Sequence, residues 1–147
     1  QEGVATLSGD RQKAFVSFQK AVQLNPKNKE ARYGLGHVYA LQGKLAQAEE
    51  EFRSAIQIDD AYSEAHTYLG QVLASQGKWE EAMESFEDAV LANPASVPPA
   101  LTHLELGRVY SKLGYAAKAR EVLGKGKALD KSGEYTDAAT ELLARVK

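Results

Sequence analysis

Residues 29–62 read KEARYGLGHVYALQGKLAQAEEEFRSAIQIDDAY, and residues 63–96 read SEAHTYLGQVLASQGKWEEAMESFEDAVLANPAS. The two stretches are identical at 14 of 34 positions without a gap, far above the level expected by chance. Most of the shared letters are small or apolar residues at helical spacing, among them the pair Phe52 and Phe86. Self-similarity at a fixed period of this length is the signature of a repeat architecture. The sequence therefore predicts stacked helical hairpins.

The pattern continues on both sides of this pair of repeats. A further copy follows at an offset of 37, so three extra residues fall at Val97-Pro98-Pro99, and a partial copy precedes residue 29. We expect one domain with this organisation: partial repeat 1–28, repeats 29–62, 63–96 and 97–131, and capping helix 132–147. The expected helices cover about 2–8, 11–24, 29–42, 45–58, 63–76, 79–92, 99–113, 116–129 and 134–146.

Glycine and proline residues mark the ends of several of these expected helices. Four glycines follow a helix end, where a left-handed residue is favoured: Gly9, Gly43, Gly77 and Gly114. Pro26 and Pro94 follow second helices of hairpins and are expected to end them. The last helix has one apolar stripe and an opposite charged face, with no partner helix after it. Such a helix suits the end of a stack, whose outer face must meet water.

Within one repeat, Leu35-Gly36 precedes Tyr39, and Ala48 precedes Phe52 by four residues; the next copy ends with Pro94. This order resembles the tetratricopeptide repeat family. The resemblance covers essentially the whole chain. It implies an all-α fold, a right-handed α-solenoid of helix-turn-helix hairpins with a C-terminal capping helix. It also implies a non-enzymatic scaffold or adaptor, of bacterial type, that binds a protein or peptide in its concave groove.

Composition narrows the possible partners. The net charge is −2 and the pI is near 6.0, which argues against a general nucleic-acid surface. Charge is uneven: residues 1–100 carry 9 Lys+Arg against 14 Asp+Glu, whereas residues 101–147 carry 9 against 6. No apolar run approaches the ~18 residues that span a bilayer, so this segment is not expected to insert into a membrane. The chain starts at Gln1 without Met, and we expect it to be a piece of a longer protein.

A catalytic or metal-binding domain is the alternative to a scaffold. The absence of cysteine excludes disulfides, thiolate catalysis and Cys-ligated zinc. The stretch 124–127 reads GKGK but lacks the first glycine and the Ser or Thr of a phosphate loop. His66 and His103 occupy the same slot in consecutive repeats, too far apart to share one ion at ~2 Å, so we interpret them as packing residues. We expect no enzyme activity, cofactor or metal.

The family resemblance also implies where a partner binds, because the first helices of successive repeats line the groove. Carried over to this chain, the expected groove residues are Tyr33, His37, Thr67, Gln71, Leu101, Leu104, Arg108 and Lys112. Chaperone-binding members of the family hold a terminal carboxylate with a Lys/Asn/Asn/Lys/Arg clamp. Only Arg108 fits that clamp here, so a chaperone-tail partner is not expected.

The junction between repeats 63–96 and 97–131, which holds the three extra residues, resembles one subgroup of the family more closely than it resembles the chaperone-binding members. Ala92-Asn93-Pro94, then the insertion with Pro98-Pro99, then Leu106-Gly107 is similar to a junction of bacterial type IV pilus pilotins. These are outer-membrane lipoproteins that assist secretin assembly, and their lipidated cysteine would lie upstream of Gln1. We expect the insertion to lengthen the loop, with Ser96 as a turn or cap residue and Pro99 in the first turn of the next helix. The fourth hairpin would then stack at a different angle and bend the groove, making residues 93–105 a recognition edge.

Overall fold

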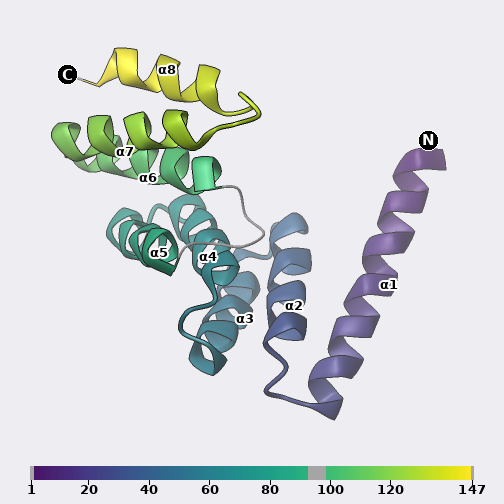
Figure 1. Ribbon diagram of the computed structural model, residues 1–147. Helices are drawn as coiled ribbons and strands as arrows, with labels where there is room; N and C mark the ends of the chain where they lie inside the picture. The colour runs from purple at the N-terminus through teal and green to yellow at the C-terminus, as the bar shows by residue number, and fades with distance from the viewer. Residues whose placement is uncertain (1, 93–98, 147) are drawn as a thin grey trace. The chain divides into compact units, whose positions relative to one another are not determined.

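The computed structural model describes residues 2–92 and 99–146, with side chains described from residue 9 onward. All regular secondary structure in these ranges is α-helical (Figure 1). The helices are α1 (Glu2–Leu24), α2 (Lys29–Leu41), α3 (Leu45–Ile58), α4 (Ser63–Ser75), α5 (Trp79–Ala92), α6 (Pro99–Leu113), α7 (Ala116–Leu129) and α8 (Thr136–Arg145). They form two compact units: residues 1–60 hold α1 to α3, and residues 61–147 hold α4 to α8.

The predicted hairpins are confirmed. Helices α2 to α7 all begin at the predicted residue and end within one residue of the predicted end. Gly43, Gly77 and Gly114 have φ of 76°, 78° and 85°, the left-handed conformation expected at these turns. In each turn the amide after the glycine donates to a carbonyl five residues earlier, as Lys44 does to Tyr39 at 2.9 Å. This closes the helix end and directs the chain back along its partner.

The prediction of a turn at Gly9 is wrong, because α1 runs through it as one helix from Glu2 to Leu24. Gly9 lacks the positive φ of the three turn glycines. A separate helix over 2–8 would also be shorter than the length at which isolated helices become stable. Continuing the existing helix is therefore the favoured outcome.

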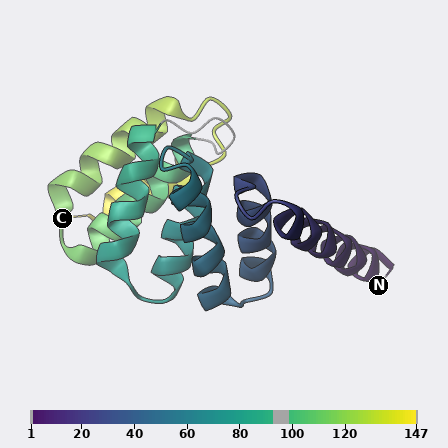
Figure 2. The same cartoon turned by 90° about the horizontal axis from the view of Figure 1, so that it is seen from below.

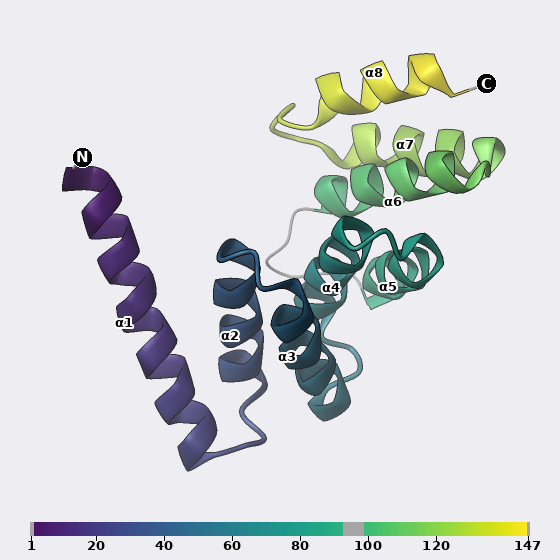
Figure 3. The same cartoon turned by 180° about the vertical axis from the view of Figure 1, so that it is seen from behind.

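Each hairpin is closed by a large side chain seated on a glycine of the partner helix. Phe52 of α3 is fully buried, and a Cβ on Gly36 of α2 would lie 2.7 Å from its ring. Phe86 of α5 is seated on Gly70 of α4 in the same way, at 2.6 Å. Because the glycines carry no side chain, the helices of a pair approach closely and run side by side (Figures 1 and 3). Both phenylalanines, which the two repeats share, are core residues.

In the fourth hairpin a leucine replaces the aromatic ring. Leu123 of α7 is fully buried, and a Cβ on Gly107 of α6 would lie 2.4 Å from it. Gly126 also lies close to α6, since its Cβ would come within 2.9 Å of His103. The pairing of α6 with α7, both drawn in green, is visible from below in Figure 2. The small residues of this hairpin thus serve close packing as they do in the others.

Helix α6 is the centre of the second unit, since it packs against α4, α5, α7 and α8. The hydroxyls of Thr67 and Thr102 lie 3.2 Å apart in its buried contact with α4. The phenol of Tyr110 donates to Glu87 of α5 at 2.7 Å. Pro99 is the first residue of α6, as predicted, whereas Pro94, Ser96, Val97 and Pro98 lie outside the described residues.

The final helix is anchored by one carboxylate that the sequence analysis did not single out. Asp130, in the turn after α7, accepts hydrogen bonds from the amide of Tyr135 and the hydroxyl of Thr136, both at 2.8 Å. It also accepts from the Gly133 amide and the Ser132 hydroxyl, both at 3.1 Å. Desolvation by itself raises the pKa of Asp130. The four hydrogen bonds lower it by more, so the pKa of Asp130 is lowered overall. The turn explains why α8 begins at Thr136, two residues later than predicted.

The ring-on-glycine contact predicts a large effect of Phe52→Ala. We expect the free energy of unfolding to fall by about 3–5 kcal/mol, since burial is lost and a cavity is left. Urea unfolding followed by circular dichroism measures it. The control is Leu24→Ala in the same unit, because Leu24 is 88% exposed. A loss below about 1 kcal/mol for Phe52→Ala would contradict the packing described here.

The Asp130 turn predicts a pH-dependent stability. The pKa of Asp130 is lower in the folded protein, so its contribution is present above the unfolded value of about 3.9 and is lost as pH falls through the folded value. Asp130→Asn should therefore lower the melting temperature at pH 7 and have a smaller effect at an acid pH below the folded pKa of Asp130. Asp10→Asn, an exposed change on α1, is the control. An equal loss at both pH values would show that charge is not the cause.

Candidate functional site

A hollow of about 530 Å³ lies between the first helices of two consecutive hairpins in the second unit. We call it the α4–α6 groove. Its lining residues are Gln71, Ala74 and Ser75 of α4, Trp79 of α5, and Glu105, Arg108, Val109 and Lys112 of α6. Three of the predicted groove residues, Gln71, Arg108 and Lys112, thus lie together.

Helical periodicity brings these side chains to one face. The lining positions of α6 follow each other at intervals of three or four residues, from Glu105 through Arg108 to Lys112. The α4 positions are spaced in the same way from Gln71 to Ser75. Ala74 and Ser75 are small, which leaves space between the two helices for a side chain from outside.

The α6 wall of the groove is positively charged at its surface. Arg108 donates to Glu105 at 2.9 Å, one turn earlier on the same helix. The side chain of Arg108 is 53% exposed whereas that of Glu105 is 18% exposed, so the guanidinium faces solvent more than its partner does. Burial raises the pKa of Glu105, and the nearby guanidinium opposes that shift. The guanidinium of Arg108 is therefore more accessible to a ligand from solvent than the Glu105 carboxylate is.

Trp79 is one of the groove residues that sequence reasoning missed, and Glu105 and Val109 are others. It is the only tryptophan of the sequence, and the ammonium of Lys112 lies 5.6 Å from its ring centroid. The contact is a cation–π interaction, which holds the lysine over the aromatic face. A signal was present in the repeat alignment, where the counterparts of Trp79 are Leu45 and Ala116. Among these three repeats, only one has a large ring at the start of its second helix. This difference indicates a role that is particular to that repeat.

Two of the predicted groove residues are in the core, and their assignment to the surface is corrected here. Thr67 is 0% exposed and its hydroxyl lies against that of Thr102. Leu104 is 4% exposed, because α6 is covered by helices on several sides. Leu101 is partly buried and does not line the α4–α6 groove. Thr67 and Leu104 correspond to positions that face a ligand in other proteins with such repeats. In this chain they pack between helices.

Tyr33 and His37 belong to the first unit and line a different cavity. Their rings are stacked with centroids 6.2 Å apart on α2, and burial lowers the pKa of His37. The cavity has a volume of about 370 Å³ and lies between α1 and α2, where Phe18 and Leu41 add apolar surface. Each unit therefore carries its own set of predicted binding residues, and those of the first unit are aromatic.

No metal centre is formed by the residues that the structure describes: they contain no group of three His, Asp or Glu side chains placed to hold an ion. His66 and His103 are both buried. A ring nitrogen of His103 lies 2.7 Å from the carbonyl of Pro99 in the first turn of α6. Between residues 2 and 146, the described helices include none that is both long and apolar enough to cross a bilayer.

Paired helices built on one repeating pattern define an α-helical repeat protein. The chain belongs to the tetratricopeptide repeat family. Models of the tetratricopeptide repeat match residues 5–54, 40–102 and 100–132. The repeats support a protein–protein interaction scaffold, because domains of this kind bind proteins or peptides and are typically non-catalytic.

Solved structures with the same fold include two named proteins. A crystal structure of MamA matches with a TM-score of 0.73 at 21% identity, covering 96% of this chain and 89% of the other. The structure of pilF from Pseudomonas aeruginosa matches with a TM-score of 0.74 at 23% identity, covering 100% of this chain and 74% of the other. At such identities the likeness concerns the fold. A search of curated protein sequences returned no match.

The Arg108–Glu105 pair predicts the effect of Arg108→Ala. The pKa of Glu105 should rise further, because its burial is then no longer opposed by the guanidinium. Side-chain carboxyl chemical shifts in an NMR titration measure this. Lys125→Ala is the control, since Lys125 pairs with Glu121 on α7. An unchanged pKa of Glu105 in the arginine variant would mean that the pair does not persist in solution.

Proposed function

We propose that the chain is a non-enzymatic scaffold that holds a peptide or protein segment in the α4–α6 groove. The observation that carries this proposal is the meeting of Arg108, Lys112 and the Trp79 ring in one hollow. Arginine and tryptophan are the residue types that most often dominate binding energy at interfaces. A lysine beside them adds charge that steers an acidic partner.

The groove chemistry describes the segment that would fit. An acidic side chain would pair with Arg108 or Lys112, and Gln71 offers an amide for a further hydrogen bond. A neighbouring aliphatic side chain would lie over Trp79 and enter the space left by Ala74. We therefore propose an acidic segment with adjacent apolar residues as the ligand, with Tyr33 and His37 of the first unit as a further contact surface.

The double variant Arg108→Ala with Lys112→Ala tests the proposal. Peptides selected on the wild-type chain from a display library of short random sequences should be enriched in Asp and Glu. Their affinity for the double variant should fall by about tenfold or more, since two charge-assisted contacts are lost. Isothermal titration calorimetry measures this, with circular dichroism to check that helicity is unchanged.

The control for this experiment is Lys13→Ala with Lys20→Ala, two exposed changes on α1 that remove the same charge. Equal losses in the two double variants would indicate a general charge effect. Selected peptides without an acidic bias, or with full affinity for the Arg108 and Lys112 variant, would overturn the proposal.

Trp79 provides a second readout because it is the only tryptophan in the sequence. An aliphatic or acidic side chain placed over its ring should change its fluorescence emission on titration with a selected peptide. The change should saturate at the Kd found by calorimetry. Binding by calorimetry without any change in emission would locate the peptide away from the groove.

A pilotin-like role in secretin assembly is our second proposed function. It is supported by the junction motif from Ala92-Asn93-Pro94 to Leu106-Gly107 and by the similarity of the whole chain to the pilF structure. The predicted change of stacking angle, which compares hairpins of different units, stays a prediction. Direct binding of a purified type IV pilus secretin subunit, measured by calorimetry, tests this role. No heat of binding would remove it and leave the scaffold proposal intact.

A further inference from the structure

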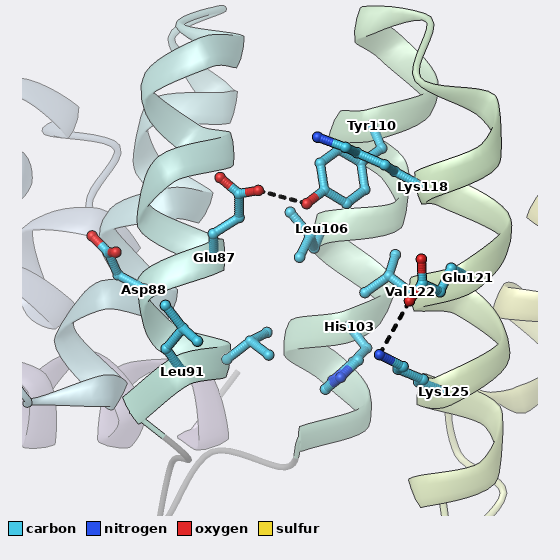
Figure 4. A pocket seen from close by; sticks show the side chains of 11 residues that line it. Glu87, Asp88, Leu91, His103, Leu106, Tyr110, Lys118, Glu121, Val122 and Lys125 are labelled. Atoms are coloured by element: carbon cyan, nitrogen blue, oxygen red, sulfur yellow. Dashed lines mark hydrogen bonds and ion pairs between the residues drawn. The ribbon is translucent and has the colours of Figure 1, made fainter.

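The second unit has another cavity, which shares no lining residue with the α4–α6 groove. It has a volume of about 560 Å³ and lies between α5 and α7, with α6 as its floor (Figure 4). Both α5 and α7 pack against α6, and the contacts of the described helices include none between α5 and α7 themselves. We call this space the α5–α7 cavity.

The middle of the α5–α7 cavity is apolar. Leu106 of α6 and Val122 of α7 form its buried floor, and Val90 of α5 lines it from the side. Leu91 lies at its edge and is 84% exposed. Figure 4 shows Leu91 on the α5 side of the opening, away from the packed core. Leu91 extends the apolar lining of the cavity to the surface, and a contiguous apolar patch of this kind marks a site that a partner covers.

The two walls of the cavity carry opposite charges. Glu87 and Asp88 make the α5 wall acidic, whereas Lys118 and Lys125 lie on the α7 wall. Glu121 also lies on α7 and is 3.3 Å from Lys125, but both side chains are more than 60% exposed, at 68% and 64%. Such an exposed pair is weak, so Lys125 can turn to a partner.

One end of the cavity is held in shape by an aromatic contact. Tyr110 of α6 donates its phenol proton to Glu87 on one wall, and the ammonium of Lys118 from the other wall lies 5.8 Å from the Tyr110 ring centroid. Burial raises the pKa of Tyr110, and the Glu87 carboxylate raises it further, so the phenol stays protonated and keeps donating. The walls are therefore fixed relative to the floor before any partner arrives.

The geometry points to a docking site for an amphipathic helix of a partner protein. The helix would place its apolar face on Leu91 and the cavity floor, a basic residue toward Asp88 and an acidic residue toward Lys125. The backbone groups of α5, α6 and α7 are bonded within their own helices, so an extended strand would find no edge to join here. A helix needs only side-chain contacts, and its residues at intervals of three and four positions match an apolar groove between two helices.

A helical peptide library tests this inference. Its members keep leucines on one face and vary Lys and Glu independently on the two flanks. Selection on the wild-type chain should enrich peptides with Lys on one flank and Glu on the other. The double variant Asp88→Lys with Lys125→Glu, which exchanges the wall charges at exposed positions, should select the reversed arrangement.

A second variant measures the apolar contact. Leu91→Asp should lower the affinity of a selected peptide about tenfold or more, because it puts a charge against the leucine face. Leu129→Asp, at an exposed leucine of α7 outside the cavity, should leave it unchanged. Fluorescence anisotropy of a labelled peptide measures both, and the Arg108 and Lys112 double variant should bind it normally, which separates this site from the α4–α6 groove.

Three results would overturn the inference. The first is the same charge arrangement selected by the wild-type chain and the charge-exchanged variant. The second is a selected peptide that binds the Leu91→Asp variant at full affinity. The third is a dimer of the wild-type chain, seen by analytical ultracentrifugation, that Leu91→Asp dissociates; it would assign the cavity to a second copy of this chain.

Discussion

A side chain seated on a glycine is the contact on which the hairpins depend. Phe52 on Gly36 and Phe86 on Gly70 each join two helices at a separation that any larger residue than glycine would prevent. At that separation the flanking alanines of the second helices, such as Ala48 and Ala82, are fully buried. The α4–α6 groove exists because α4 and α6 are each held in this way from behind.

Most of the fold could be predicted because these contacts are local and require particular residue types at a fixed spacing in the sequence. Every helix from α2 to α7 begins where the repeat pattern placed it. Gly9 shows the limit: the residue type that follows a helix end at Gly43, Gly77 and Gly114 lies inside the continuous helix α1. A glycine permits a turn but does not impose one.

The site was predicted less completely for a related reason. Gln71, Arg108 and Lys112 could be found by transferring family positions, whereas Thr67 and Leu104 could not, since burial depends on how the next helix covers them. Trp79 was not predicted because an alignment of the repeats identifies the residues that they share. The other repeats have a different residue at the position of Trp79. Recognition residues are positions at which one repeat differs from its neighbours. They can be identified only after the structural positions that all repeats share have been set aside.

The seated side chains have a further consequence for how the chain acquires its fold. Gly36 and Phe52, Gly70 and Phe86, and Gly107 and Leu123 are each separated by 16 positions, and so are Phe18 and Gly34. Closing a loop of this length is entropically inexpensive, and chains dominated by such short-range contacts fold quickly. A hairpin emerging from the ribosome can therefore begin to pack before the next repeat has been synthesised.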